Sequence, residues 1–384
     1  MVGESDRGTK REHRQAGDAQ DPDADDGYVG NYLALAWLLL GSSLAGVVLW
    51  LHFAAAPSDP QPTAETKPAA IVEPPAAPPV ADKSPAPSPA AAKEAPEPQK
   101  IVEVPAPSVR LVPRDERVAP AFDAALVGPS PDGPVPIVAA DGRQAWRVYA
   151  RPFDAADKRP RIAIVIGDLG LSQTATLGAI QNLPSDVTLA FTPYAGGLKN
   201  WLTQARGAGH EVLLQLPMEP NDFPASDPGP RALMTALSTD DNLKRVNWIL
   251  ARAGGYVGLT NSMGSRFSAS ADDLRPVLAR LKSHGLLYVD SRASAASVAA
   301  KLAGELGLPF ASNSRFIDVE VSRSAIDARL EELERIAKAN GAALGIGLPY
   351  PATIERVAAW AQGLEKRGIA LAPVSAVVNR QPSE

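Results

Sequence analysis

The sequence contains no cysteine, and its charges nearly balance. Among 384 residues there are 43 Asp and Glu against 38 Lys and Arg, which gives a net charge of −5. The lack of cysteine excludes disulfide bonds and metal sites built on thiolates. The small net charge gives no indication of nucleic acid as a partner. The length allows one large domain with accessory segments.

One long apolar run is present near the N-terminus. Residues 1–30 are polar and rich in Asp, Lys and Arg, which predicts a disordered segment. Residues 31–55 then carry a single ionisable side chain, His52, and at ~1.5 Å per residue they are long enough to cross a ~30 Å hydrocarbon core. Four basic residues precede the run and the next follows only at Lys67; they are Arg7, Lys10, Arg11 and Arg14.

This charge bias predicts a cytoplasmic N-terminus, with the Asp-rich residues 18–26 between the basic residues and the membrane. We therefore expect a single-pass inner-membrane protein whose C-terminal domain lies in the periplasm. A cleaved signal peptide, with "FAAAP" as its cleavage site, is the alternative. The run is longer than the usual apolar region of such a peptide, which favours an uncleaved anchor.

Proline is abundant, at 37 residues, and it is concentrated in one segment. Residues 56–108 are dominated by Pro and Ala, a composition that cannot bury a core, and we interpret them as an extended linker. Residues 109–150 are interpreted as an extension packed on the folded domain, with Trp146 and Tyr149 as its anchors. The domain itself is predicted over residues 151–380.

Apolar strands and amphipathic helical stretches alternate in this last part. Strands are predicted at 161–166, 187–191, 211–216, 256–259, 286–289, 308–311, 342–346 and 369–374. Helices are predicted at 173–182, 196–208, 239–253, 271–284, 295–306, 322–340 and 352–367. Such alternation indicates an α/β fold with a parallel sheet, and the number of units favours closure into a barrel.

Polar residues follow five of these strands. Ligands of parallel α/β folds bind at the carboxyl ends of the strands, so these residues are expected to share one face. They are Asp168 after the first strand, Glu219 after the third, Asn261, Ser262 and Arg266 after the fourth, Asp290 and Arg292 after the fifth, and Tyr350 after the seventh. The alternative is that each residue only forms a turn or a helix cap.

The same loops resemble the divergent polysaccharide deacetylases, a bacterial family related to carbohydrate deacetylases. The resemblance lies in "RIAIVIGDLG", "GHEVLLQLPMEP", "DPGPRALMT", "NSMGSRF", "LYVDSR" and "LPYPATI", in that order, and it extends from about Trp146 to Val378. It implies a distorted (β/α) barrel. It also implies zinc-dependent removal of acetyl groups, with one aspartate of a consecutive pair as base, the other as ligand, and two histidines completing the metal site.

This sequence departs from the family pattern at each of those positions. Gly167 replaces the first aspartate of the pair, Ser262 replaces the histidine of the "N-x-M-G-S" loop, and Leu348 replaces the histidine of the last loop. The four histidines, His13, His52, His210 and His284, all lie away from the predicted face. We therefore expect no zinc cofactor and no metal ligand of the family type. A weak Mg²⁺ or Ca²⁺ site on Asp168, Glu219 and Asp290 stays open.

Asp168 is then the remnant of a metal-and-base pair. It can accept hydrogen bonds from sugar hydroxyls, pair with Arg266 or Arg292, or cap the helix that begins near Ser172. Two functions compete. One is a membrane-anchored periplasmic hydrolase of acetylated glycans, with impaired or lost deacetylation. The other is a non-catalytic envelope protein that binds a glycan or a partner. In both cases the expected partner is an envelope glycan or an acetylated oligosaccharide, together with the membrane through residues 31–55.

Overall fold

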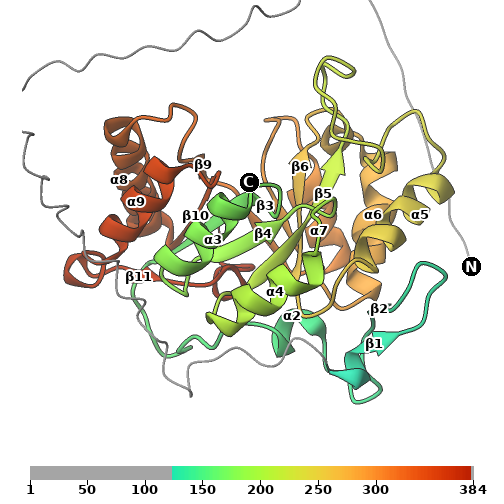
Figure 1. Cartoon of the computed structure of the whole chain (residues 1–384), viewed down its shortest axis with the longest axis horizontal. Helices are drawn as coiled ribbons and strands as arrows, with labels where there is room; N and C mark the ends of the chain where they lie inside the picture. Colours follow the sequence, from blue (N-terminus) through green and yellow to red (C-terminus); the bar gives the residue numbers. More distant parts are fainter. Residues whose placement is uncertain (1–122, 382–384) are drawn as a thin grey trace, which may run out of the picture. The chain divides into compact units, whose positions relative to one another are not determined.

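The computed structural model describes residues 123–381, and a parallel β-sheet forms their centre (Figure 1). Along the sheet the strand order is β8-β7-β6-β5-β4-β3-β10-β9, and β11 adds to β3. The strands are β3 Arg161–Leu169, β4 Thr188–Phe191, β5 Val212–Met218, β6 Gly258–Met263, β7 Leu287–Asp290, β8 Phe310–Ser312, β9 Arg315–Phe316, β10 Ala342–Gly347 and β11 Ala370–Leu371. A separate antiparallel pair consists of β1 Val127–Gly128 and β2 Val135–Pro136.

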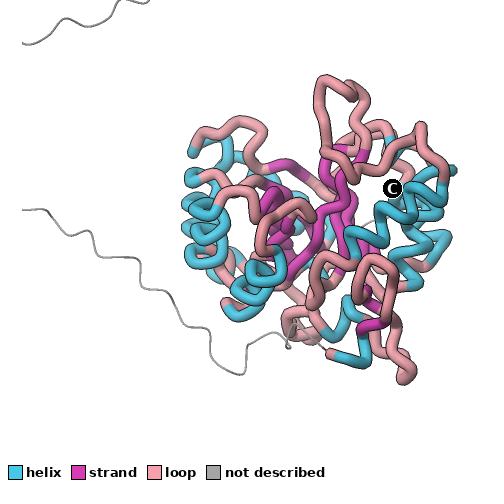
Figure 2. Tube along the Cα trace, turned by 45° about the vertical axis from the view of Figure 1, so that its right-hand side comes forward, coloured by secondary structure: helices cyan, strands magenta, loops and turns pink. Residues whose placement is uncertain are grey.

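Helices lie on both sides of the strands, which occupy the middle of the domain (Figure 2). They are α2 Ala145–Val148, α3 Gln173–Asn182, α4 Leu198–Gly207, α5 Thr239–Leu250, α6 Ala271–Ser283, α7 Ala299–Leu306, α8 Arg323–Asn340 and α9 Pro351–Ala361. Single 3₁₀ turns are η2 Ala124–Leu126, η3 Phe267–Ala269, η4 Glu365–Arg367 and η5 Val374–Ala376.

The sheet is curled, because one short segment forms both of its ends. β8 pairs with β7, and only Asn313 and Ser314 separate it from β9, which pairs with β10. At this break the Ser314 N–H donates to the carbonyl of Leu344 on β10. The expected α/β class and barrel-like parallel sheet are thus confirmed as a curled parallel sheet. The predicted strand 308–311 corresponds to β8, and the two-residue β9 that follows it was not predicted.

The first strand shows why the sheet is parallel and buried. Residues 162–166 of β3 are fully buried, as expected when helices cover the outside and side chains fill the inside. Each such Ile contributes roughly 1.5–3 kcal/mol of burial free energy. Gly345 on β10 must be small, because a β-carbon there would lie 2.5 Å from Leu333 of α8. Helix α8 therefore packs directly on the backbone of β10.

Two strand boundaries differ from the predictions in ways that affect the site. The strand predicted at 256–259 is β6, which extends to Met263 because each residue from Gly258 onward pairs with β5. Asn261 and Ser262 therefore lie in a strand and not in a loop. The strand predicted at 369–374 is shorter, and its end becomes the turn η5.

The residues before β3 lie against the domain. Tyr149 is 2% exposed, and its hydroxyl accepts the Asp123 N–H at 3.1 Å. The predicted segments 1–30, 31–55 and 56–108, and residues 109–122 of the extension, lie outside the described residues. None of the helices within residues 123–381 has the length and apolar character needed to cross a membrane.

Candidate functional site

Asp168 lies near the carboxyl end of β3 in a strained backbone conformation. Its φ is +52°, in the left-handed region that non-glycine residues seldom adopt. The side chain is half-buried, and its Oδ1 accepts a hydrogen bond of 2.8 Å from Nε2 of Gln215. Gln215 belongs to β5, so it reaches across the inside of the curl to β3. Backbone strain of this kind is characteristic of functional sites.

Gly167 lies directly against the same glutamine. A β-carbon at Gly167 would be 3.1 Å from Gln215 Nε2 and 4.0 Å from Leu348 Cδ2. Positions 167 and 348, which depart from the family pattern, and position 215 are therefore neighbours. The amide of Gln215 lies beside Gly167, where the family pattern has an aspartate.

Two buried polar atoms on β5 and β6 have no hydrogen-bond partner among residues 123–381. They are Oε1 of Gln215 and Oγ1 of Thr260. The two residues are paired in register on β5 and β6, so their side chains lie on the same face of the sheet. Gln215 is 6% and Thr260 3% exposed. An unpartnered buried polar group costs about 1–3 kcal/mol, so this interior is poised to accept a polar ligand or water.

A second carboxylate, Asp318, shares this end of the sheet. It follows β9, and its Oδ2 accepts hydrogen bonds from the Leu348 N–H at 2.7 Å and from the Thr353 hydroxyl at 2.9 Å. Burial raises the pKa of Asp318, and the negative charge of Asp168 adds to this increase. Asp318 therefore fixes the loop that carries Leu348 and holds a second carboxyl group close enough to interact with Asp168.

Glu219 and Arg266 form a separate group at the end of β5. Glu219 is 4% exposed, and its Oε2 accepts the N–H and the hydroxyl of Thr235 at 2.6 and 2.7 Å. Its Oε1 lies 3.4 Å from Nη1 of the half-exposed Arg266. The carboxylate therefore fixes the loop around Thr235 and is already occupied by protein donors.

Asn261 and Asp290 are likewise engaged with the protein. Asn261 Oδ1 accepts the N–H of Ser291 at 2.7 Å, and its Nδ2 donates to the carbonyl of Met263. Asp290 accepts the N–H of Arg292 and the hydroxyl of Ser297. These bonds join the ends of β6 and β7. For Asn261, Asp290 and Glu219 the turn-forming role is the one that the contacts support.

The remaining predicted residues lie at the edges of this end. Ser262 is half-buried on β6, beside Pro217 of β5. Arg292 has φ of +52° in the loop after β7, and Tyr350 precedes α9 with 39% of its surface exposed. Arg266 is paired with Glu219, and the pairing of Asp168 with Arg292 stays a prediction. The interpretation of Asp168 as a helix cap is wrong, because Ser172 is the N-cap of α3 and accepts the Ala175 N–H.

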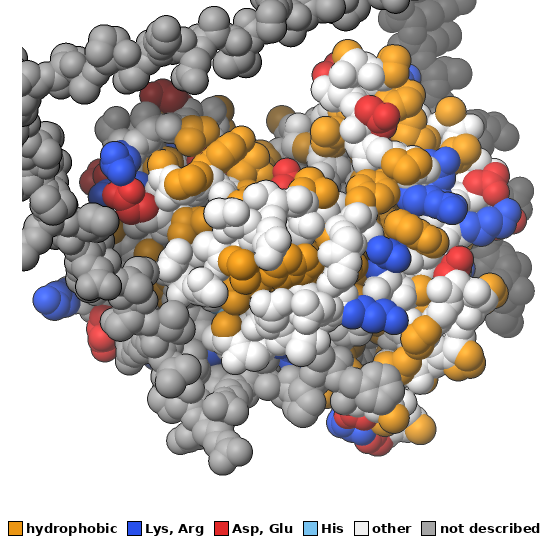
Figure 3. Space-filling model, viewed as in Figure 1, with side chains coloured by type: hydrophobic (Ala, Val, Ile, Leu, Met, Phe, Trp, Pro, Cys, Tyr) orange, Lys and Arg blue, Asp and Glu red, His pale blue; other side chains and the backbone are white. Residues whose placement is uncertain are grey.

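Exposed apolar side chains surround the strand ends. They come from the loops that follow β3, β5, β9 and β10 and from the end of β6, and they are Leu171, Phe223, Met263, Val319 and Tyr350. Figure 3 shows hydrophobic side chains on both sides of the hollow at the upper edge, the edge to which β5 points in Figure 1. An apolar rim around a few polar groups is the usual composition of a ligand site.

Comparison with known proteins supplies the family. The profile of the divergent polysaccharide deacetylases matches residues 164–378, which is more than half of the chain. The chain belongs to the divergent polysaccharide deacetylase family. The matched range includes Gly167, Asp168, Gln215, Asp318 and Leu348.

Three similar proteins support this membership, and all are uncharacterised. The protein YibQ of Escherichia coli is 26% identical over 194 residues, which are 50% of this chain and 60% of that protein. A Haemophilus influenzae protein is 28% identical over 197 residues, 50% of this chain and 68% of its own. A solved Agrobacterium tumefaciens structure, 38% identical, has a TM-score of 0.63 and covers 64% of this chain and 100% of its own. This chain thus spans less than two thirds of the first relative.

The residues around Asp168 do not fit the zinc that the family resemblance implies. Within residues 123–381, no group of three or more His, Cys, Asp or Glu side chains is arranged to hold a metal ion. Asp168 faces the N–H of an amide, and Ser262 and Leu348 occupy the positions of the histidines. His210 lies between the carbonyls of Val187 and Ile180, before β5. The open alternative of a site on Asp168, Glu219 and Asp290 is wrong, since these side chains do not converge.

Sequence reasoning missed Gln215, Thr260 and Asp318. Gln215 was visible as the one polar side chain in the apolar run "VLLQL". Asp318 follows a strand, as the other candidates do, but that strand is only two residues long and was not predicted. The signal for Thr260 was absent, because a threonine in a strand is ordinary.

Proposed function

We propose that the chain is a glycan-binding member of its family, which holds an N-acetylated envelope glycan without the family's zinc-dependent deacetylation. One observation carries the proposal. Asp168, which the resemblance makes a zinc ligand or base, accepts a hydrogen bond from the Gln215 amide, and Gly167 beside it has no side chain. A carboxylate held in this way is a hydrogen-bond acceptor, and sugar hydroxyl and acetamide N–H groups are donors.

Two further features support binding as the function. The Gln215 amide that bonds Asp168 has an unpartnered oxygen, the neighbouring Thr260 on β6 has another, and both can receive additional donors. The apolar rim offers contacts for the non-polar faces and methyl groups of an acetylated sugar. A groove with convergent acceptors and an apolar rim favours a ligand that is rich in hydroxyl and amide donors.

The catalytic alternative lacks parts that its chemistry requires. Amide hydrolysis by the family's route needs a metal to polarise the carbonyl and to activate water. Here a serine and a leucine replace the two histidines, and Asp318 already binds the loop at Leu348 through its Oδ2. The positions that would build the metal site instead shape a binding groove.

The Asp168→Ala variant tests this proposal. A charge-assisted hydrogen bond contributes about 1.5–3 kcal/mol, so the affinity for chitooligosaccharides or peptidoglycan fragments should fall at least about tenfold. Isothermal titration of the purified full-length chain measures this. Asp272→Ala, on the exposed side of α6, is the matched control and should bind as the wild type does.

Two results would oppose binding as the function. Unchanged glycan affinity of a folded Asp168→Ala protein would remove Asp168 from the site. Release of acetate by the wild-type chain, lost in the variant, would support the hydrolase instead.

We also propose that residues 31–55 anchor the protein in the inner membrane, with the domain in the periplasm. The support is the apolar run and the basic residues before it, the nearest of which is Arg14. An alkaline phosphatase reporter fused after residue 384 should be active. A reporter that is active only as a cytoplasmic fusion would reverse the orientation.

A further inference from the structure

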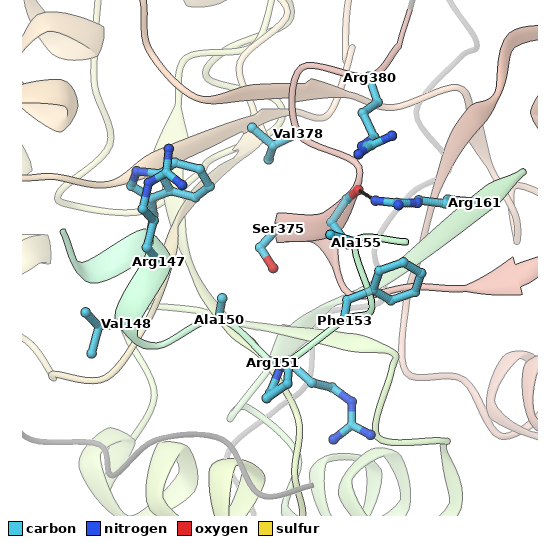
Figure 4. A pocket seen from close by; sticks show the side chains of 13 residues that line it. Arg147, Val148, Ala150, Arg151, Phe153, Ala155, Arg161, Ser375, Val378 and Arg380 are labelled. Carbon is cyan, nitrogen blue, oxygen red and sulfur yellow. Dashed lines mark hydrogen bonds between the residues drawn. The ribbon is translucent and has the colours of Figure 1, made fainter. Parts of the chain in front are cut away.

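A large pocket lies at the opposite end of the sheet from Asp168. Its volume is about 740 Å³, and it is lined by residues of the segment 146–155, by Arg161 and by the turn 375–380 (Figure 4). Arg161 begins β3 and Asp168 lies near its end, so about seven residues at ~3.3 Å each, some 23 Å, separate the two sites. The pocket is therefore independent of the proposed glycan groove.

The lining is strongly basic. Four arginines contribute to it, namely Arg147, Arg151, Arg161 and Arg380, and no Asp or Glu does. Arg151 is already paired with Asp186 at 2.8 Å, and in Figure 4 its guanidinium points away from Ser375. The charge that faces the pocket therefore comes from the other three arginines.

Arg161 is a buried cation without a carboxylate partner in the described part of the chain. It is 4% exposed and donates to the carbonyls of Ala376 and Asp157 at 2.9 and 3.1 Å. Its guanidinium lies 4.5 Å from the centre of the Phe153 ring. Burial lowers its pKa, and the charge of Arg380 lowers it further, while the charges of Asp157 and Asp154 oppose this decrease. A buried charge without an ion-pair partner is costly, and a bound anion would offset that cost.

The cationic groups stand on two separate walls. In Figure 4 Arg147 lies on one side of the pocket, while Arg161 and Arg380 lie together on the other. The guanidinium of Arg147 lies 4.2 Å from the ring centre of Trp146. Between the two walls are Ala150, Val378 and Ser375, so the middle of the pocket is mostly apolar. A fitting ligand carries two anionic groups with a non-polar portion between them.

We propose that this pocket binds a short acidic peptide segment of a partner protein, with one carboxylate at Arg147 and another at Arg161 and Arg380. A volume in the range of ligand pockets, ~300–1,000 Å³, accommodates several residues. Inorganic phosphate would fill only part of it and reach one wall. A lipid headgroup with a single phosphate carries its charge at one point and would leave the second wall unpaired. Guanidinium forks are matched to carboxylates, and bidentate pairs provide specificity.

A peptide titration with the full-length chain in detergent tests the proposal. The probe is a fluorescein-labelled heptapeptide with glutamate at its second and sixth positions and alanine or valine elsewhere. Its counterpart with two glutamines measures the contribution of the charges. Saturable binding of the glutamate peptide is expected, and it should weaken at least about tenfold in Arg147→Gln and in Arg380→Gln.

Control variants show whether a loss of peptide binding is specific to the pocket or follows from any loss of positive charge. Arg323→Gln on α8 removes the same charge from a distant surface and should leave the affinity unchanged. Arg380→Lys keeps the charge and should retain part of the binding. Thermal unfolding of each variant establishes that it is folded. Equal affinity for both peptides, or unchanged affinity in folded Arg147→Gln and Arg380→Gln, would overturn the proposal.

Competitors identify the class of anion. Inorganic phosphate and soluble dihexanoylphosphatidylglycerol, each at millimolar concentration, should displace the peptide poorly. If either binds in an Arg380-dependent manner while the glutamate peptide does not, the ligand is a phosphate or a lipid headgroup and the peptide assignment is wrong.

Discussion

A buried carboxylate at the amino end of the sheet, Glu211, and a buried amide towards the carboxyl end, Gln215, differ in how fully they are hydrogen-bonded. At the amino end, Glu211 is fully buried and accepts hydrogen bonds from the Arg151 N–H and from the N–H and hydroxyl of Ser375. At the carboxyl end, Gln215 and Thr260 each have a buried polar atom with no partner among the described residues, and Asp168 is strained. Satisfied groups stabilise a fold, whereas unsatisfied and strained groups are retained where a ligand binds.

At the amino end, the charges of Glu211 and Arg206 oppose each other. Burial raises the pKa of Glu211, and its hydrogen bonds and the charge of Arg206 oppose that increase. Burial lowers the pKa of Arg206 to about 10, while Glu211 acts in the opposite direction. Glu211 and Arg206 thus lie buried at the amino end of the sheet, beside the arginine pocket. The comparison therefore contrasts the fully bonded Glu211 at the amino end with the unpartnered Gln215 and Thr260 towards the carboxyl end.

Glu211→Ala should have the largest effect on stability. Removal of one partner from a buried ionic network leaves the other charge uncompensated, here Arg206, and costs about 3–5 kcal/mol. Urea denaturation followed by circular dichroism gives the free energy of unfolding. Glu355→Ala removes a carboxylate of an exposed ion pair and should change stability far less. A small loss in Glu211→Ala would show that the amino end is not held by this network.

Gly167→Asp should lower the free energy of unfolding by less than Glu211→Ala does. The new β-carbon would press on Gln215, and the new charge would lie beside Asp168, so we expect a loss of about 1–3 kcal/mol. Gly167→Ala carries the steric part alone and should lose less. With Gln215→Ala in the same chain, that steric loss should largely disappear.

Zinc binding tests the carboxyl end of the sheet in a second way. The variant with Gly167→Asp, Ser262→His and Leu348→His should gain zinc affinity, measured by metal analysis after dialysis, whereas the wild type should retain no stoichiometric zinc. Stoichiometric zinc in the wild type would show that its ligands lie elsewhere.

Among these variants Asp318→Asn should change stability least, and it should mainly change how stability depends on pH. The pKa of Asp318 is raised in the folded state, so the folded protein holds its proton more tightly than the unfolded chain. Its contribution to stability is therefore present below about pH 3.8 and is lost as the pH rises through the raised pKa. Relative to Asp318→Asn, the wild type should lose stability as the pH rises above about 3.8. A difference that does not change with pH would mean that the Asp318 carboxyl is not perturbed.

Local patterns in the sequence were sufficient for most elements of the domain. The helix at 173–182 was predicted with the bounds that the structure has, because Ser172 is a cap and apolar residues recur along it. The buried strands were recognised from continuous apolar runs such as 162–166. The ends that were wrong, at β6 and β8, depend on pairing with neighbouring strands, and pairing is not encoded in a local pattern.

The sequence by itself determined the family, the alternating α/β order and the loss of the histidines at Ser262 and Leu348, since each of these is a property of residue types in a fixed order. Only the tertiary structure decided what each polar residue does. Glu219, Asn261 and Asp290 are used by their own loops, while Gln215 and Asp318 reach the surroundings of Asp168 from strands far away in the chain. Curling of the sheet brings these strand ends together, and contacts across a curl depend on distances that residue order does not contain.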